Sequence, residues 1–280
     1  TNDVITVSAS DTSSVSGATV SVNTDGTFTY DPSTSDAIQA LGTGDPLVDT
    51  FNYTVTDNQF APDGLLRVRA FNVVGGGVSN DNDLNDTAET FNLWNALDAL
   101  PAGTTGAVAV GGTTYNVQNN HDITATRADY AGGGGNFGVN TPYANIGAGL
   151  GGDDFSIRAS SFLRFNTGGT YSIAAGADDG RQVTLRDIGF STGYSGVSVG
   201  AGSQGGTALV GTDTVRFNGT TGHNVSIATF TVDAGDILEL DTFFFERGGG
   251  DSFEVSVAQG APANFNTTDY QLLTQGIHGI

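Results

Sequence analysis

The stretch ILELDTFFFERGGGDSFEVSV, residues 237–257, contains two apolar runs on either side of a glycine-rich turn. The runs 237–245 and 252–257 have the length and the β-branched and aromatic content of strands. Three consecutive phenylalanines, Phe243, Phe244 and Phe245, are too apolar for an edge strand that is exposed on both faces. We therefore expect residues 237–245 to form a central strand of a sheet.

Strand patterns continue on both sides of this stretch. In 65–74, Leu66, Val68 and Ala70 alternate with Arg67 and Arg69, which predicts one apolar and one polar face. The one convincing helix is 87–100, where apolar residues recur every third position before a proline. Short strands and glycine-rich loops are expected over 102–150, and further strands over 155–164, 170–175, 182–185, 213–217 and 225–232.

The composition is that of a β-protein with many loops. The chain has 42 Gly, no Cys and no Met, all nine of its basic residues are Arg, and Asp greatly outnumbers Glu. A net charge of −21 argues against nucleic acid and anionic membrane surfaces as partners. No run of 18 apolar residues exists, so membrane insertion is not expected, and the absence of Cys excludes disulfides and thiolate metal sites.

Two distant turns carry the candidate site. The first is 177–180, with the adjacent pair Asp178 and Asp179, and the second is 246–251, with three glycines before Asp251. Two carboxylates side by side are costly without a cation. Ca²⁺ takes six to eight oxygens from carboxylates and carbonyls, so we expect the turns to meet around one Ca²⁺.

The first 58 residues alternate as short strands, with an Asp25-Gly26 hairpin turn and a helical turn at 36–41. The segments VNTDGTFTYDP (22–32), AIQAL (37–41) and DTFNYTVTD (49–57) resemble VCBS and cadherin-like repeats of bacterial surface adhesins. This resemblance implies a partial immunoglobulin- or cadherin-like sandwich over residues 1–60. Four or five strands are fewer than a sandwich needs. The C-terminal tail, a neighbouring part of a longer polypeptide, or strand donation by another copy is expected to complete it.

Residues 61–280 resemble the protective-antigen-type β-sandwich domain of anthrax protective antigen, yeast flocculins and epithelial adhesins, and bacterial adhesins. The matching segments are DFSIR (154–158), GGTYSI (168–173), ADDGR (177–181), ILEL (237–240) and FFERGGGDSFEV (244–255). The implied fold class is all-β: a larger sandwich with one short helix, following the partial N-terminal one.

Lectins of this family hold one Ca²⁺ with a paired-Asp turn, whose Asp-Asp peptide is typically cis, and a second loop, and sugar hydroxyls complete the coordination. The resemblance implies metal ligation by Asp178, Asp179 and Asp251 and by backbone carbonyls of the 247–250 turn, here Arg247 and Gly249. The same residues, with Arg181 in place of Arg247, are expected to contact the sugar. Gln182, Tyr143 and Tyr194 are further candidates for sugar contact.

Several alternatives stay open at this point. The aspartate pair could be a solvated turn, or a Ca²⁺ there could be purely structural. The stretch 80–86 has acidic spacing like a Ca²⁺-binding EF-hand, but Asp86 stands where Gly belongs and Asn92 where Glu belongs, so it indicates a polar loop and helix cap. The motif GFSTG at 189–193 matches the hydrolase elbow without a following helix.

The sequence therefore predicts an extracellular, cell-surface bacterial adhesin module that binds glycans through Ca²⁺. The alternative is a structural subunit of an extracellular filament or surface layer, which assembles by strand complementation between copies. No catalytic set is evident, so we do not expect an enzyme; adjacent Asp178 and Asp179 do not face each other across a cleft as glycosidase carboxylates do.

Overall fold

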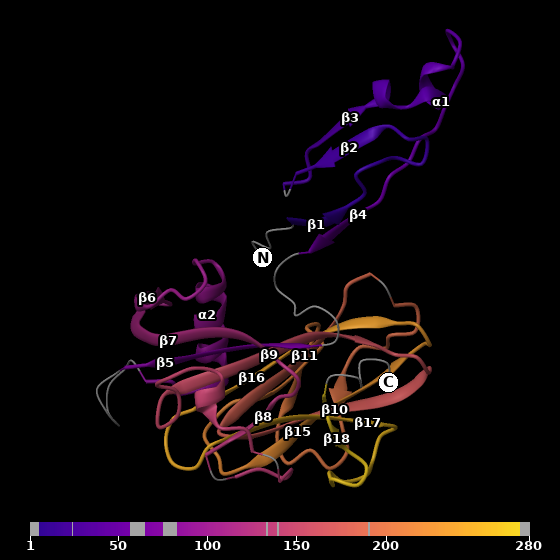
Figure 1. The fold of residues 1–280 in the computed structure, drawn as a ribbon. Helices are drawn as coiled ribbons and strands as arrows, with labels where there is room; N and C mark the ends of the chain where they lie inside the picture. Colours follow the sequence, from indigo (N-terminus) through magenta and orange to yellow (C-terminus); the bar gives the residue numbers. More distant parts are fainter. Residues whose placement is uncertain are drawn as a thin grey trace. The chain divides into compact units, whose positions relative to one another are not determined.

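The computed structural model describes residues 6–23, 25–56, 65–74, 83–132, 134–138, 140–189 and 191–274. The chain divides into two compact units, residues 1–59 and 60–280 (Figure 1). The predicted linker over 59–64 and the first part of the EF-hand-like stretch lie outside the described residues.

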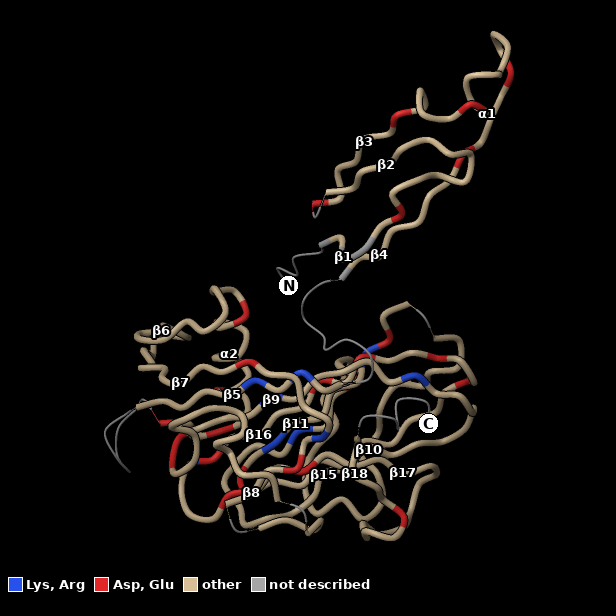
Figure 2. Tube along the Cα trace, viewed as in Figure 1, with Lys and Arg blue, Asp and Glu red and all other residues tan. Residues whose placement is uncertain are grey.

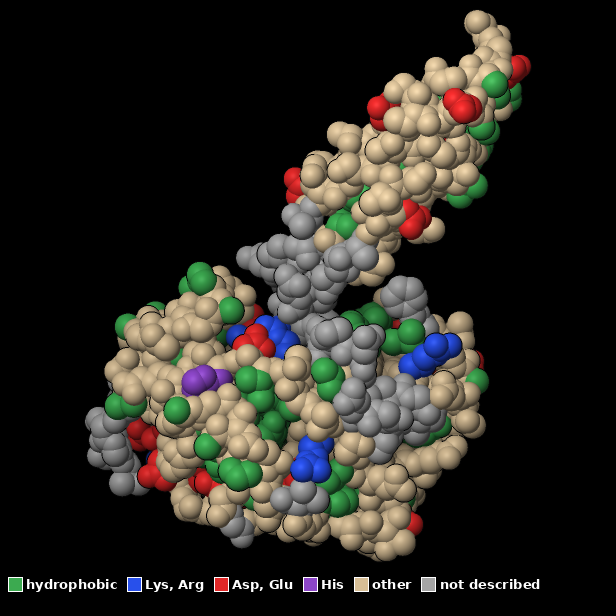
Figure 3. All heavy atoms as spheres, viewed as in Figure 1, with side chains coloured by type: hydrophobic (Ala, Val, Ile, Leu, Met, Phe, Trp, Pro, Cys, Tyr) green, Lys and Arg blue, Asp and Glu red, His purple; other side chains and the backbone are tan. Residues whose placement is uncertain are grey.

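The N-terminal unit consists of two small antiparallel sheets. One pairs β1 (Thr6–Ser10) with β4 (Tyr53–Thr56), and the other pairs β2 (Thr19–Val22) with β3 (Phe28–Asp31). A 3-10 turn, η1 (Pro32–Thr34), and α1 (Asp36–Gln39) follow β3, and α1 is the predicted helical turn. Ala18 and Val20 are the only buried apolar residues described in this unit. Hydrophobic side chains are visible on its surface in Figure 3.

The second unit is a sandwich of two antiparallel sheets, as predicted. The eight-stranded sheet has the order β13-β14-β11-β16-β9-β5-β7-β6, formed by β5 (Leu66–Val73), β6 (Gly106–Val110), β7 (Thr113–Ala125), β9 (Phe155–Arg164), β11 (Gly180–Asp187), β13 (Thr207–Leu209), β14 (Thr214–Phe217) and β16 (Ile237–Glu246). The six-stranded sheet has the order β12-β15-β10-β17-β18, with β8 also pairing β17; its strands are β8 (Asp129–Ala131), β10 (Gly169–Asp178), β12 (Ser198–Val199), β15 (Asn224–Val232), β17 (Ser252–Gln259) and β18 (Gln271–Leu272).

The phenylalanine run lies at the centre of the eight-stranded sheet, which confirms the prediction. Phe244 points between the two sheets, into a core that also contains Val183 and Phe253. Phe243 and Phe245 point to the opposite face and pack in a second core. All three phenylalanine side chains are fully buried, because side chains cover both faces of the sheet here.

A helix forms the cover on that opposite face. Asp86 caps the N-terminus of the helix α2 (Thr87–Asp98). Its carboxylate accepts a hydrogen bond from the backbone amide of Glu89 at 2.7 Å, as expected of a helix cap. Trp94 is fully buried and packs edge-on against Phe71, with 4.5 Å between the ring centroids. Its Nε1 donates a hydrogen bond to Ser156 Oγ at 2.9 Å. Ring packing and this buried hydrogen bond help to attach the helix to the sheet.

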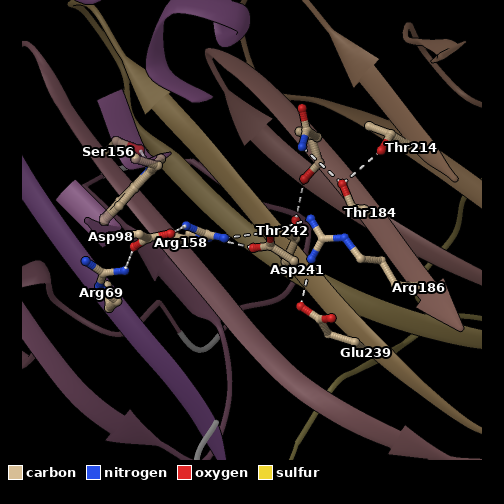
Figure 4. A network of polar contacts seen from close by, with 12 residues as sticks. Arg69, Asp98, Ser156, Arg158, Thr184, Arg186, Thr214, Glu239, Asp241 and Thr242 are labelled. Atoms are coloured by element: carbon tan, nitrogen blue, oxygen red, sulfur yellow. Dashed lines mark hydrogen bonds and ion pairs between the residues drawn. The ribbon is translucent and has the colours of Figure 1, made fainter. Parts of the chain in front are cut away.

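Beyond the helix, this face of the eight-stranded sheet is polar. Figure 4 shows Arg158 between two carboxylates, with 2.7 Å contacts to Asp98 at the end of α2 and to Asp241 on β16. Arg69 also pairs with Asp98, and Arg186 pairs with Glu239. In Figure 2 basic residues gather on β5, β9 and β11. Arg69, Arg158 and Arg186 are each paired with a carboxylate, so this face carries an ion-pair network.

One part of the fold differs from the sequence analysis. Residues 106–125, expected to be short strands and loops, form a long hairpin of β6 and β7 around Gly111 and Gly112, which both adopt positive φ. In β7, Tyr115 and Val117 are the only buried residues, so its apolar alternation is short. A 3-10 turn, η2 (Tyr143–Asn145), lies between β8 and β9. No described helix is long and apolar enough to cross a membrane.

Candidate metal and ligand site

The two predicted turns meet because both cross from one sheet to the other at the same end of the sandwich. The aspartate pair lies between β10 and β11, and residues 247–251 lie between β16 and β17. Gly180 pairs with Phe245 in one sheet, and Asp178 pairs with Ser252 in the other. These two registers bring together segments that are 68 positions apart in the sequence.

Three carboxylates converge there: Asp178, Asp179 and Glu246, each with one oxygen within 4.8 Å of the others. Glu246 is thus the third member of the converging group, and metal ligation by Asp251 stays a prediction. Asp251 is not among the three carboxylates that meet within 4.8 Å, and its Oδ1 accepts hydrogen bonds from the Gly132 amide at 2.5 Å and the Tyr143 hydroxyl at 3.0 Å. Its negative charge still contributes to the raised pKa of Asp178.

Backbone donors hold Asp179 in place. Its Oδ1 accepts from the amide of Thr221 at 2.6 Å and its Oδ2 from the amide of Arg247 at 3.1 Å. Its own amide donates to the Phe245 carbonyl at 3.2 Å. The peptide bond between Asp178 and Asp179 is cis, as the family resemblance implied. Asp179 therefore joins three separate segments of the chain at this site.

Glu246 is the residue whose surroundings most clearly require another ligand. Its side chain is fully buried, and neither carboxylate oxygen has a hydrogen-bond partner among the described residues. Burial, reinforced by the charges of Asp179 and Asp178, raises the pKa of Glu246 to about 9. Burial and the charges of Asp179 and Asp251 raise the pKa of Asp178 to about 6. Without a cation Glu246 therefore retains its proton at neutral pH.

Arg181 does not lie where the predicted sugar contact requires it. The side chain is fully buried between the sheets, where Nε donates to Ser226 Oγ at 2.9 Å and Nη1 donates to the Asp179 carbonyl at 3.2 Å. Its guanidinium also bonds Asn224 and lies 4.7 Å from the Phe217 ring centroid. Burial lowers its pKa to about 9. Arg181 therefore supports the aspartate turn from the core side, through its hydrogen bond to the Asp179 carbonyl.

Of the other residues predicted to contact a sugar, some lie at the site and some do not. Gln182 is 1% exposed and binds Thr184 and Arg216, so it is not available to a sugar. The hydroxyl of Tyr194 donates to the Leu185 carbonyl, away from the turn. Tyr143 does border the site, through its bond to Asp251. Arg247 and the exposed Gly249 lie in the turn that follows Glu246, and metal ligation by their carbonyls stays a prediction.

Gly180 is required by the packing at this site. A Cβ atom there would lie 2.3 Å from Phe245 Cε1, 2.6 Å from Thr87 Oγ1 and 2.9 Å from the Gly219 carbonyl oxygen. The last of these contacts is with backbone, which cannot rotate away. The helix α2 and the loop before β15 therefore approach the aspartate turn closely.

The raised carboxyl pKa values predict how stability depends on pH. In chelator, the folded state holds a proton on Glu246 up to a pKa of about 9, whereas the unfolded chain releases it near 4.5. The folded state thus binds more protons between these values, and stability falls as pH rises through this window. We expect the melting temperature in chelator to decrease from pH 5 to pH 9, and excess Ca²⁺ to flatten this dependence by replacing protons.

The control for this experiment is Glu246→Gln, which removes the titrating group with little change in shape. Its melting temperature in chelator should depend less on pH than that of the wild type. An equal slope in both proteins would mean that Glu246 does not carry the effect.

Comparison with solved structures finds similar folds at low identity. A PA14 domain of the MpAFP antifreeze protein is 15% identical, with a TM-score of 0.40 over 77% of this chain and 91% of that chain. A PA14 sugar-binding domain from an RTX adhesin is 17% identical, with a TM-score of 0.40 over 76% and 95%. The epithelial adhesin 9 A domain of Candida glabrata, in complex with Galβ1-3GlcNAc, is 12% identical, with a TM-score of 0.41 over 78% and 95%.

No protein-family model and no curated protein matches the chain. The TM-scores of these three structures are below 0.5, so the likeness carries no conclusion about function.

Glu246 is the site residue that the sequence analysis did not identify as a ligand. A signal was present, because Glu246 directly follows the phenylalanine run. A carboxylate at the end of a strand that is buried on both faces is itself expected to be buried and to need a partner. Its pairing with Phe155 on β9 places it inside the sandwich end, and that register is not evident from the sequence.

Proposed function

We propose that this protein is a non-enzymatic, Ca²⁺-dependent carbohydrate-binding module of a cell-surface adhesin. The observation that carries the proposal is the convergence of Asp178, Asp179 and Glu246 from two inter-sheet turns, with both oxygens of Glu246 buried and unpartnered among the described residues. All donors are oxygens and no Cys exists in the chain, which favours a hard cation such as Ca²⁺.

The three carboxylates would have different roles in binding. Asp178 is half-buried, so it would face both the ion and the solvent side, whereas Asp179 and Glu246 are buried and would face the ion alone. Ca²⁺, when bound, would offer coordination positions to vicinal hydroxyls of a sugar, as the family resemblance implies. Asp178 and Asp251 would accept hydrogen bonds from those hydroxyls, with Arg181 holding the turn from inside.

A glycan array with and without a Ca²⁺ chelator tests this function. We expect binding to terminal sugars with vicinal hydroxyls, lost in chelator and restored by added Ca²⁺. Glycan binding that persists in chelator would contradict the proposed mechanism. Ca²⁺ binding without any glycan binding would leave the ion structural and contradict the proposed function.

A second candidate function is favoured by the N-terminal unit. Among the described residues, 12 large hydrophobic side chains are exposed, and eight belong to residues 1–59: Val15, Phe28, Tyr30, Leu41, Leu47, Val48, Tyr53 and Val55. Two-stranded sheets are marginal by themselves. We propose that strand donation from another copy of the chain, within an extracellular assembly, covers this surface.

Sedimentation at increasing protein concentration tests this assembly. We expect the wild type to associate, and the double variant Tyr53→Ser/Val55→Ser to associate more weakly, because both side chains are more than half exposed on β4. Val210→Ser, at a fully exposed position in the other unit, is the control and should behave as the wild type. A wild type that stays monomeric at all concentrations would exclude self-assembly.

A further inference from the structure

A second group of buried carboxylates lies on the outer face of the six-stranded sheet. Asp129 on β8 pairs directly with Glu254 on β17. Their neighbours Tyr130 and Phe253 point into the core between the sheets, so both carboxylates point to the outer face. Asp129 is 0% exposed and Glu254 is 1% exposed.

Residues 134–138 and 140–141, between β8 and η2, lie next to this pair. The Thr141 amide donates to the Asp129 carbonyl, which returns the loop to the strand that it left. Gly135 has φ +112, and a Cβ atom there would lie 2.5 Å from Glu254 Oε1 and 3.3 Å from Asn140 Oδ1. The side-chain oxygen of Asn140 and the carboxylate of Glu254 therefore both lie beside Gly135.

The two carboxylates differ in their hydrogen-bond partners. Glu254 accepts from the amides of Asn136 and Phe137, each at 2.8 Å, and His223 Nε2 lies 3.6 Å from its Oε2. These donors favour the charged form of Glu254. In contrast, neither oxygen of Asp129 has a hydrogen-bond partner among the described residues, and no described ion pair joins Asp129 to the nearby Arg127.

Two carboxylates opposite each other on neighbouring strands repel, and burial increases the cost. The supporting donors serve Glu254, so Asp129 requires a positive charge of its own or a proton. The oxygens of Asp129, Glu254 and Asn140 together form the donor set that a hard divalent cation prefers. Burial also raises the pKa of Asp129, and the charge of Arg127 and the backbone amide of Asn140 offset this rise only in part.

We propose that Asp129 and Glu254, with the side-chain oxygen of Asn140, bind a second Ca²⁺ beneath the loop 132–141. This ion ties the loop to the six-stranded sheet. The same loop supplies the Gly132 amide that holds Asp251 beside the first carboxylate group. The second ion therefore stabilises the loop that positions Asp251 beside the first site, without being a part of that site. Its binding does not depend on sugar binding.

Equilibrium dialysis of the chelator-stripped full chain against ⁴⁵Ca²⁺ tests the proposal by stoichiometry. We expect two ions per wild-type chain, one in Asp129→Asn, one in Asp178→Asn and none in the double variant. Asp187→Asn makes the same change of charge at an exposed position and should retain two.

The outcomes separate this inference from the proposed function. One ion in the wild type, lost in Asp178→Asn and kept in Asp129→Asn, would overturn the second site and leave the first intact; Asp129 and Glu254 would then share a proton. Should Asp129→Asn fail to fold by near-ultraviolet circular dichroism, Asp178→Asn alone decides, because it keeps one ion only if the second site exists.

Discussion

Replacing Asp178 by Asn should weaken Ca²⁺ binding at the first site at least about 100-fold, since loss of a group that only supports a metal ligand already costs 10–100-fold. Asp178 is the half-buried member of the converging carboxylates, so it would connect a bound ion to the solvent side where a sugar would bind. Glycan binding should be lost together with the ion. Isothermal titration of Ca²⁺ into stripped protein measures the first effect, and the glycan array measures the second.

Asp251→Asn is the matched control, because it removes the same charge from the neighbouring position. It should weaken Ca²⁺ binding less than Asp178→Asn, since the side chain of Asp251 is held by Gly132 and Tyr143 outside the converging group. If Asp251→Asn has the larger effect, the ion is bound nearer the 247–251 turn, and Asp251 rather than Glu246 is its third carboxylate ligand.

Trp94→Ala should destabilise the sandwich by about 3–5 kcal/mol, the usual cost of truncating a large buried aromatic side chain. The indole fills the core between α2 and the eight-stranded sheet, and its loss also leaves Ser156 Oγ without its donor. The guanidinium of Arg69 lies 5.1 Å from the ring centroid, and that contact would also be lost. Urea unfolding followed by circular dichroism measures the change.

Trp94→Phe separates the two contributions. It keeps most of the ring packing against Phe71 and removes the indole donor, so its loss should be clearly smaller than that of Trp94→Ala. Equal losses in both variants would assign the effect to the hydrogen bond with Ser156 rather than to the packing of the helix.

The sheet positions could be predicted where both faces of a strand carry a strong pattern. The range 155–164 is the observed β9, and the phenylalanine run is central as expected. The β6–β7 hairpin was not predicted, because most of β7 faces solvent and only two of its 13 residues are buried. A strand with so few buried positions has little apolar alternation to detect.

Only some of the residues of the candidate site could likewise be predicted from the sequence. Asp178 and Asp179 could be identified because the segment 177–181 resembles the family's paired-Asp turn; adjacency alone would also select Asp153 and Asp154. The burial of Glu246 depends on its pairing with Phe155 across the sheet, which composition and spacing do not specify. Arg181 could have been assigned correctly, since it shares a strand face with Val183 and Leu185, both in the core between the sheets.

The most direct test of the central claim is an anomalous difference map from crystals grown with Ca²⁺. The account predicts a peak among the carboxylates of Asp178, Asp179 and Glu246, with their oxygens about 2.3–2.6 Å from it. It would be contradicted by a Ca²⁺-saturated crystal in which this position has no peak and Glu246 is hydrogen-bonded to Asp178 or Asp179 through a shared proton.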